Sequence, residues 1–417
     1  KNYGYDGKIR ILQTFLSFSQ KEMTFSQAEE MLQKNNLILL AEQYSLTAAQ
    51  AVEIQAKIWE QPYVSAEFNL LNPDANRMFD IGRQGQKRFE IQQLIYLGGK
   101  KKNEVALAKK NTEIAKLQLE QLLRNLRLEL SNNFFSVFYE NKKLKKINFQ
   151  ISQIDSLSIN YDAQAEKGNI ALKEVVRLKS LVLNLKKERN DLLEELLKLK
   201  QNLSLLTGVS ENIEPVMDEY QSLANLQNVL LSKEMLLEKS LSDNLDYLTA
   251  IKNAESQAVN LKLQKSLSIP DITAGISYDQ FSGAFNNEMN FSIGIPLPLW
   301  NKNKGNIKIA EAEVQQAKLL KEYKKVELES SVESLWQLWN NQVEQVRYIP
   351  TTMTQNLDLV LKGMVKNFQK RNIPLIEFID FMESYNQSNI EIYEIKKSWI
   401  LTCMNINYIT NQDFFKI

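Results

Sequence analysis

The chain has 417 residues, of which 51 are basic and 50 acidic, so its formal net charge is only +1. This balance provides no bulk field that would attract nucleic acid, and we expect no nucleic-acid partner. The sequence has no histidine and a single cysteine, Cys403, which excludes imidazole catalysis, an internal disulfide and a thiolate metal cluster. We therefore expect no catalytic residue, no cofactor and no metal site, and the composition offers no support for an enzyme.

Residues 1–23 form the expected N-terminal segment. Lys8 and Arg10 precede the apolar stretch Ile11–Phe18, which is similar to a shortened signal-peptide core without a small-residue cleavage site. A degenerate or trimmed export signal and an ordinary mature N-terminus are equal alternatives here. Nowhere does the sequence reach the roughly 20 apolar residues that a transmembrane helix needs.

Long helices dominate the first half. A helix is predicted at Phe25–Ile58, and Lys100–Lys167 contains neither glycine nor proline and is rich in residues that favour helix. The second segment would be on the order of 100 Å long, wider than any globular core. Gly168 and Asn169 end it, and Leu172–Thr207 follows as another helix whose leucines recur at coiled-coil-like spacing.

The second half follows the same plan. Residues 208–225 interrupt the helical pattern as a connecting segment, and a helix is predicted at Leu226–Lys265. Another should begin near Asn306, kink near Pro350 and end around Arg371. Pro374 fits the first turn of a final helix that continues toward Ile409, because proline's missing N–H is not needed there. Residues 412–417 form a tail.

Four segments alternate between apolar and polar residues, as strands do. They lie in two pairs, at 62–97 and 270–299, and are Tyr63–Leu70, Phe89–Leu97, Asp271–Asp279 and Met289–Leu297. In the second of them, Gln92 and Gln93 interrupt the alternation and predict a bulge.

Two interpretations of the strands remain open. One is a small soluble sheet with one buried face. The other is a lipid-facing barrel wall around a wet lumen, in which Trp59, Tyr96 and Trp300 at the strand ends would form an aromatic girdle at the membrane interface. Four strands cannot close a barrel, since about eight is the practical minimum, so this wall would need several copies of the chain.

The sequence also repeats itself about two hundred residues apart. KGNIALKEV at Lys167–Val175 recurs as KRNIPLIEF at Lys370–Phe378, an offset of 203 (370 − 167). Phe89, Ile91 and Leu97 recur as Phe291, Ile293 and Leu299, an offset of 202 (291 − 89). A near-constant offset indicates one structural unit used twice. We predict one repeat at 24–207, with its turn at 167–172, and another at 226–411, with its turn at 370–375.

This plan resembles the TolC family of outer-membrane efflux channels, over about residues 24–411. The motifs that carry the resemblance are MTFSQAEEMLQKNN (Met23–Asn36), YDAQAEKGNIALKEVVRLKS (Tyr161–Ser180) with its second copy, and IPLPLWNKNKG (Ile295–Gly305). The last of these is similar to the cobalt-zinc-cadmium branch of the family.

The resemblance implies a mainly helical fold with a small β part. Tandem long helical hairpins of a homotrimer would form a periplasmic tunnel, and four strands per chain would build a 12-stranded barrel in the lipid of the cell outer membrane. The chain would be a passive exit duct for metal cations or small toxic compounds, which an inner-membrane pump and a periplasmic adaptor deliver. Alternatives are the outer-membrane component of a type I protein secretion system and, in a different class, a soluble coiled-coil scaffold or periplasmic adaptor.

Charged residues beside the two turns are candidates for a pore constriction. Glu377 and Asp380 lie at i, i+3 and so share a helix face, and the resemblance implies tunnel-constricting acids at these positions. Glu174 is the equivalent acid of the first repeat, but Arg177 follows where the second repeat has Asp380. The alternative is that such acids only stabilise the helix dipole. Some family members carry a latching arginine at the place of Ile373, and here Arg371 lies two residues earlier.

The turns are also candidates for an adaptor-docking surface. The residues concerned are Gly168, Asn169, Ile170, Leu172, Asn372, Ile373 and Leu375. The alternative for the isoleucines and leucines is packing within the chain.

Overall fold

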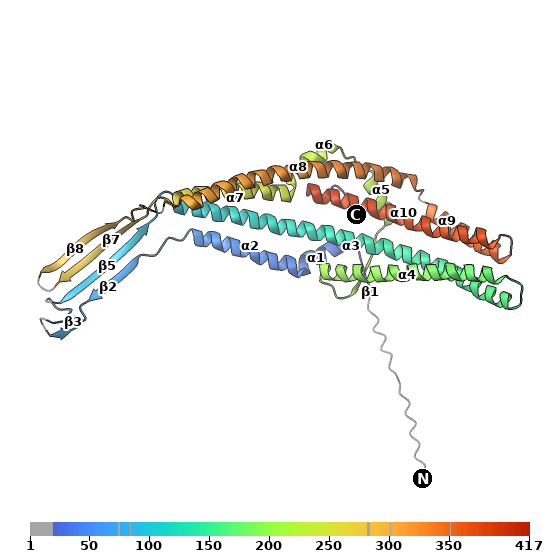
Figure 1. Ribbon diagram of the computed structural model, residues 1–417, viewed down its shortest axis with the longest axis horizontal. Coiled ribbons are helices and arrows are strands. Elements are labelled where there is room, and N and C mark those ends of the chain that lie inside the picture. The colour runs from blue at the N-terminus through green and yellow to red at the C-terminus, as the bar shows by residue number, and fades with distance from the viewer. Residues whose placement is uncertain (1–19, 74–75, 84, 282–283, 301, 351) are drawn as a thin grey trace, which may run out of the picture.

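The computed structural model describes residues 20–73, 76–83, 85–281, 284–300, 302–350 and 352–417. The candidate export signal therefore lies almost wholly outside the described residues. The molecule is elongated, with a sheet at one end, long helices through the middle and helix-to-helix turns at the other end (Figure 1).

The strands of the main sheet are β2 (Tyr63–Phe68), β5 (Gln86–Ile95), β7 (Ile272–Phe281) and β8 (Phe285–Gly294). They lie in the order β2-β5-β7-β8, and every neighbouring pair is antiparallel. The predicted bulge is wrong: β5 pairs with β7 in continuous register through Gln92 and Gln93. The irregularity lies instead between Asp279 and Phe281.

Two small sheets were not predicted. β1 (Gln20–Met23) pairs in parallel with β6 (Asn212–Pro215), which ties the N-terminal segment to the connecting segment. β3 (Leu71–Asn72) and β4 (Arg77–Met78) form a short hairpin in the loop between β2 and β5.

The longest helix, α3 (Lys100–Glu166), has 67 residues and is therefore about 100 Å long. It is followed by α4 (Leu172–Thr207), which packs against it, and α3 also contacts the helices α2, α7 and α10. These two helices end within a residue of their predicted limits, because glycine at Gly168 and Gly208 adopts a left-handed conformation that stops each of them.

The helix predicted at Phe25–Ile58 is in fact two helices, α1 (Phe25–Asn35) and α2 (Leu37–Ala56). The one predicted at Leu226–Lys265 is likewise divided into α6 (Lys233–Asp243) and α7 (Leu245–Ser266), and a short helix α5 (Glu219–Gln227) lies in the connecting segment before it. Each break occurs at a buried asparagine that caps the next helix.

Near Pro350 the chain does not merely kink, because α8 (Lys304–Tyr348) and α9 (Met353–Gln369) are separate helices. Pro374 is the N-cap of α10 (Leu375–Thr410) rather than a residue of its first turn. An N-cap residue has extended backbone angles, and Pro374 has a ψ of 157°.

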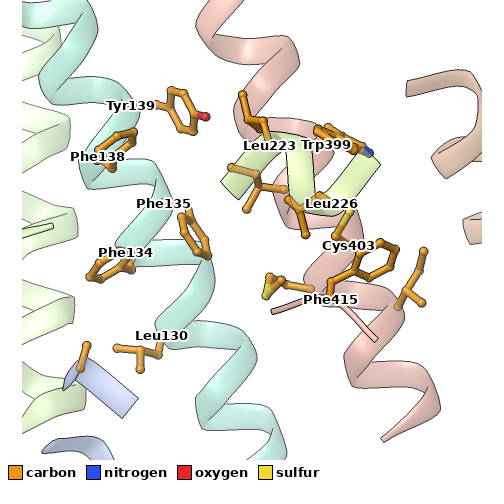
Figure 2. Packing of buried hydrophobic residues seen from close by; sticks show 14 of the residues in the cluster. Leu130, Phe134, Phe135, Phe138, Tyr139, Leu223, Leu226, Trp399, Cys403 and Phe415 are labelled. Carbon is orange, nitrogen blue, oxygen red and sulfur yellow. The ribbon is translucent and has the colours of Figure 1, made fainter. Parts of the chain in front are cut away.

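The helices bury two separate apolar cores. We name the first the equatorial core; it includes residues of α3 from Leu126 to Tyr139 and of α10 from Tyr393 to Ile409, together with α1, α5, α8 and the tail. Figure 2 shows four aromatic side chains of α3 (Phe134, Phe135, Phe138 and Tyr139) on one side of this core, and Trp399 and Cys403 of α10 on the other. The second, the tip core, lies toward the turns and begins on α3 at Ile147.

Candidate functional site at the helix turns

The turn between α3 and α4 is built on Gly168 and Asn169. Gly168 has φ of +76°, and nothing lies within 4 Å of the position that a Cβ would take. The Asn169 N–H donates to the carbonyl of Gln164 (2.9 Å), and its side-chain amide donates to the Gln164 side chain (2.7 Å). The backbone bonds are those of a Schellman motif, which satisfies the last carbonyls of a helix.

The turn between α9 and α10 repeats this geometry. The N–H groups of Arg371 and Asn372 donate to Phe368 (2.9 Å) and Asn367 (3.0 Å), in the same pattern as before. Arg371 has φ of +61° at the place of Gly168. A left-handed conformation costs a residue with a side chain on the order of 1 kcal/mol, so the second turn is strained where the first is not.

The candidate constriction residues lie on the exposed side of these turns. Glu377 and Asp380 are exposed on the first turns of α10, while Glu174 is half-buried on α4 and Arg177 is exposed. In the part of the chain that the structure describes, no salt bridge neutralises Glu377 or Asp380. Their negative charge is therefore available to anything that passes the turn.

Three aromatic rings connect the two turns, and sequence reasoning missed them. Tyr161 of α3 stacks on Phe368 of α9 (centroids 5.3 Å apart), which stacks on Phe378 of α10 (4.2 Å). Their only sequence signal is that each lies within ten residues of a turn.

Charges from both turns act on this stack. Burial raises the pKa of Tyr161, the carboxylate of Glu174 raises it further, and the guanidinium of Arg371 opposes them. Glu174 of the first turn and Arg371 of the second therefore lie within electrostatic reach of the same ring.

The candidate docking residues differ in exposure between the turns. Leu172 is 73% exposed, whereas Leu375, its equivalent in the second turn, is 8% exposed and packs into the tip core. Ile373 is partly buried against the same core, and Ile170 is half-buried. The two asparagines, Asn169 and Asn372, are exposed. Only part of this set is thus free to meet a partner.

The main sheet has one apolar and one polar face. Along one row, Val64 pairs with Ile91, Ile91 with Ile276, and Ile276 with Phe291. Ile91, Ile276 and Phe291 are 48%, 51% and 68% exposed, so none of the residues that the structure describes covers this apolar row.

On the polar face, charged side chains form a network. In the strand register Glu67 lies opposite Arg88, and Arg88 lies opposite Asp279. The Arg88 Nε lies 3.5 Å from the Asp279 carboxylate, which also accepts a hydrogen bond from Asn290 (3.0 Å). This face is therefore suited to water and the other face to an apolar medium.

The three aromatic residues predicted for a membrane interface lie where the sheet meets the helices. Trp59 and Tyr96 are in contact, with centroids 5.9 Å apart, and the Tyr96 hydroxyl donates to Glu60 (3.3 Å). Trp300, at the end of the segment after β8, is 93% exposed. Within the described residues, no group of acidic or cysteine side chains is placed to hold a metal ion. None of the helices described has an apolar window long enough to cross a membrane.

Comparison with known proteins supports this fold. No protein-family model matches the chain. It is 22% identical over 253 residues to the cobalt-zinc-cadmium resistance protein CzcC of Cupriavidus metallidurans. That alignment covers 59% of this chain and 58% of CzcC, so the chain matches less than two thirds of that relative.

Solved structures are similar over almost the whole chain. CusC, whose transmembrane channel formation has been described, superposes with a TM-score of 0.72 at 15% identity, covering 93% of this chain and 91% of CusC. The outer membrane protein VceC of Vibrio cholerae gives 0.68 at 16% identity, covering 94% and 96%. The CmeC outer membrane channel of Campylobacter jejuni gives 0.70 at 10% identity, covering 93% and 85%.

These similarities define the class: the chain has the mainly helical fold of the outer-membrane channel proteins. The resemblance to the TolC family, with CzcC as its metal-resistance relative, is thereby confirmed at the level of the fold.

Proposed function

We propose that the chain is one protomer of a passive exit duct in the outer membrane, serving a tripartite efflux system. The observation that carries this proposal is the two-faced sheet at one end of helices about 100 Å long. Its apolar face is uncovered and its polar face holds a charged network, as a lipid-facing wall around a wet lumen requires. The duct catalyses no reaction, and transport energy comes from the pump.

A homotrimer would complete this wall. Among the strands that the structure describes, β2 and β8 each have a neighbour on one side only, and an unpaired edge is a template for another strand. Because β2 and β8 run in opposite directions, β8 of one copy can pair in antiparallel fashion with β2 of the next. Three copies of the four strands give 12, above the practical minimum for a barrel.

The helices that lead to these edges support the same contact. α2 leads into β2, and its exposed apolar residues include Leu37, Tyr44 and Val52. α8 follows β8, and its exposed apolar residues include Leu319, Tyr323 and Val326. A second copy of the chain would bury both faces at once, forming the tunnel wall in the periplasm below the barrel.

The two repeats, 24–207 and 226–411, would each give this trimer one strand pair and one pair of long helices. The turns would then lie at the periplasmic end, where the adaptor and the pump deliver substrate. Six turns around one opening would place Glu377 and Asp380 in a ring that favours cations. A metal cation as cargo is supported by the name of CzcC, a cobalt-zinc-cadmium resistance protein.

Ion selectivity in lipid bilayers tests the constriction. We expect Glu377→Gln with Asp380→Asn to lower the preference for K⁺ over Cl⁻ and to raise conductance. The matched control is Glu194→Gln with Glu195→Gln, two exposed acids of α4 far from either turn. A reversal potential that the turn variant leaves unchanged would reject the acidic ring.

Fractionation tests the location independently of selectivity. We expect the chain in the outer-membrane fraction, extractable only with detergent and migrating as a trimer. A soluble monomer would favour the scaffold or adaptor instead. If deletion of the gene causes a normally secreted protein to accumulate in the cell, the result would favour the alternative that the chain is a type I secretion component.

A further inference from the structure

On α3, charged side chains separate the two apolar cores of the helical part, and on α10 their partners Glu394 and Lys397 lie at the near end of the equatorial core, which begins there at Tyr393. On α3 the equatorial core ends at Tyr139 and the tip core begins at Ile147. The sequence between them, Glu140–Lys146, reads ENKKLKK. The side chains that fill this gap come from α3 and α10, and at its margins from α5 and α9.

Four of these residues form a closed ionic cluster, which we name the ionic layer: Glu140 and Lys143 of α3, and Glu394 and Lys397 of α10. Glu140 accepts from Lys397 (2.7 Å) and pairs with Lys143 (2.9 Å), and Glu394 pairs with Lys397 (2.9 Å) and with Lys143. The Glu140 side chain is 1% exposed, that of Lys143 7% and that of Lys397 14%, whereas that of Glu394 is 44% exposed.

Further ion pairs extend the layer sideways. Glu219 of α5 accepts from Lys396 of α10 (3.1 Å) and pairs with Lys142 of α3. Lys146 of α3 pairs with Asp358 of α9 (2.5 Å), which also accepts the Tyr385 hydroxyl (2.8 Å). At this level, many of the contacts between helices are therefore ionic, beside the aromatic contact of Tyr139 with Tyr393.

Glu394 and Lys397 both remain charged in the folded chain. Burial by itself would raise the pKa of Glu394, but hydrogen bonds from Lys143 and Lys397 outweigh it and hold the pKa below its ordinary value. Burial would lower the pKa of Lys397, yet Glu140 and Glu394 keep it above its ordinary value.

Three of the four side chains are largely buried, and a buried ion pair often stabilises a structure less than apolar packing of similar volume, because the desolvation penalty offsets the attraction. Apolar burial, by contrast, contributes in proportion to the area removed from water. The ionic layer is therefore a weak lateral junction between two strongly packed cores.

A second observation falls at the same level. α8 and α9 are separate helices, and Asp358, which pairs with Lys146, lies in the second turn of α9. The break between α8 and α9 therefore lies within about two helical turns of the ionic layer.

We infer that the ionic layer is the boundary between two cooperative units. The parts of α3, α4, α9 and α10 on the tip side of this layer unfold and refold locally while the equatorial core stays folded. This inference concerns packing within the chain and stands whether or not the chain transports anything.

Hydrogen exchange of the full-length protein in detergent tests it with two variants of opposite effect. Glu140→Gln leaves two buried lysines short of a partner, and we expect amides of the tip core to exchange at least tenfold faster while those of Leu126–Tyr139 are unchanged. The second variant combines Glu140→Leu, Lys143→Met, Glu394→Gln and Lys397→Met, which removes two charges of each sign. With these uncharged side chains the two cores would pack as one, and we expect amide exchange in the tip core to slow severalfold.

The matched control removes exposed ion pairs between α3 and α4, through Asp162→Asn with Lys179→Met and Asp155→Asn with Lys186→Met. It should leave both cores unchanged. If Glu140→Gln accelerates exchange in both cores equally, the helices form one cooperative unit and the inference is wrong. If the fused variant does not fold, the comparison of the two cores in Glu140→Gln decides alone.

Discussion

Replacing Asn36 by alanine should destabilise the junction between α1 and α2. Asn36 is 3% exposed, and its side-chain oxygen accepts from the N–H groups of Ile38 (3.1 Å) and Leu39 (3.0 Å). Its side-chain amide donates to the carbonyl of Leu206 at the end of α4 (3.0 Å). Loss of the cap costs about 1 kcal/mol. The buried carbonyl left without a donor adds about 1–3 kcal/mol.

The expected loss of about 2–4 kcal/mol corresponds to roughly 30-fold or more in local opening, since about 1.4 kcal/mol is tenfold. Hydrogen exchange at the first turn of α2 and the last turn of α4 measures it. Thr24→Ala is the control, because Thr24 caps α1 in an exposed position and its loss should cost only about 1 kcal/mol. The reasoning is refuted if Asn36→Ala accelerates exchange no more than Thr24→Ala does, or if α4 is unaffected.

Two further predictions concern the turns and the sheet. Arg371→Gly should stabilise the second turn by on the order of 1 kcal/mol, and Gly168→Ala should destabilise the first by a similar amount. Thermal unfolding measures both changes, and the strain argument is contradicted if both variants shift stability in the same direction. Phe291→Lys places a charge on the apolar face. It should make membrane insertion about 2–4 kcal/mol less favourable and so lower the yield of assembled trimer, whereas Asn290→Lys on the polar face should not. Equal assembly of the two variants would argue against a lipid-facing wall.

The long helices could be predicted because helix-breaking residues are absent from them. Between Lys100 and Lys167 nothing competes with helix formation, and the glycines that end α3 and α4 are visible in the sequence. The breaks at Asn36 and Asn244 could not be predicted in this way, because asparagine is only mildly unfavourable in a helix.

What makes each of these asparagines a cap is a distant partner. Asn36 meets the carbonyl of Leu206 and Asn244 that of Ile409 (2.8 Å), contacts 170 and 165 residues apart in sequence. The two contacts are equivalent. Asn36 connects the start of α2, which leads to the sheet, with the end of α4, which returns from the first turn, and Asn244 connects α7 with α10 in the same way. Only the folded chain reveals this.

For the sheet, alternation identified which residues share a face but not the order of the strands. The pairing of β5 with β7 joins segments about 190 residues apart, and no local pattern encodes it. At the first turn, Gly168 and Asn169 indicated where the long helix ends, whereas the stack of Tyr161, Phe368 and Phe378 depends on how α3, α9 and α10 approach one another.

The two turns share one backbone conformation but differ in chemistry. The first exposes Leu172 and Arg177, and the second exposes Arg371, Glu377 and Asp380. In the proposed trimer, turns of the two kinds alternate around one opening, so each acidic face has a basic neighbour on either side. Exposed charges act on one another mainly within the Debye length, which is about 10 Å at 0.1 M salt, so a basic side chain that close to the acidic ring would partly cancel its attraction for cations. Selectivity should therefore depend on Arg177 as well as on Glu377 and Asp380, and Arg177→Gln should strengthen the preference for cations.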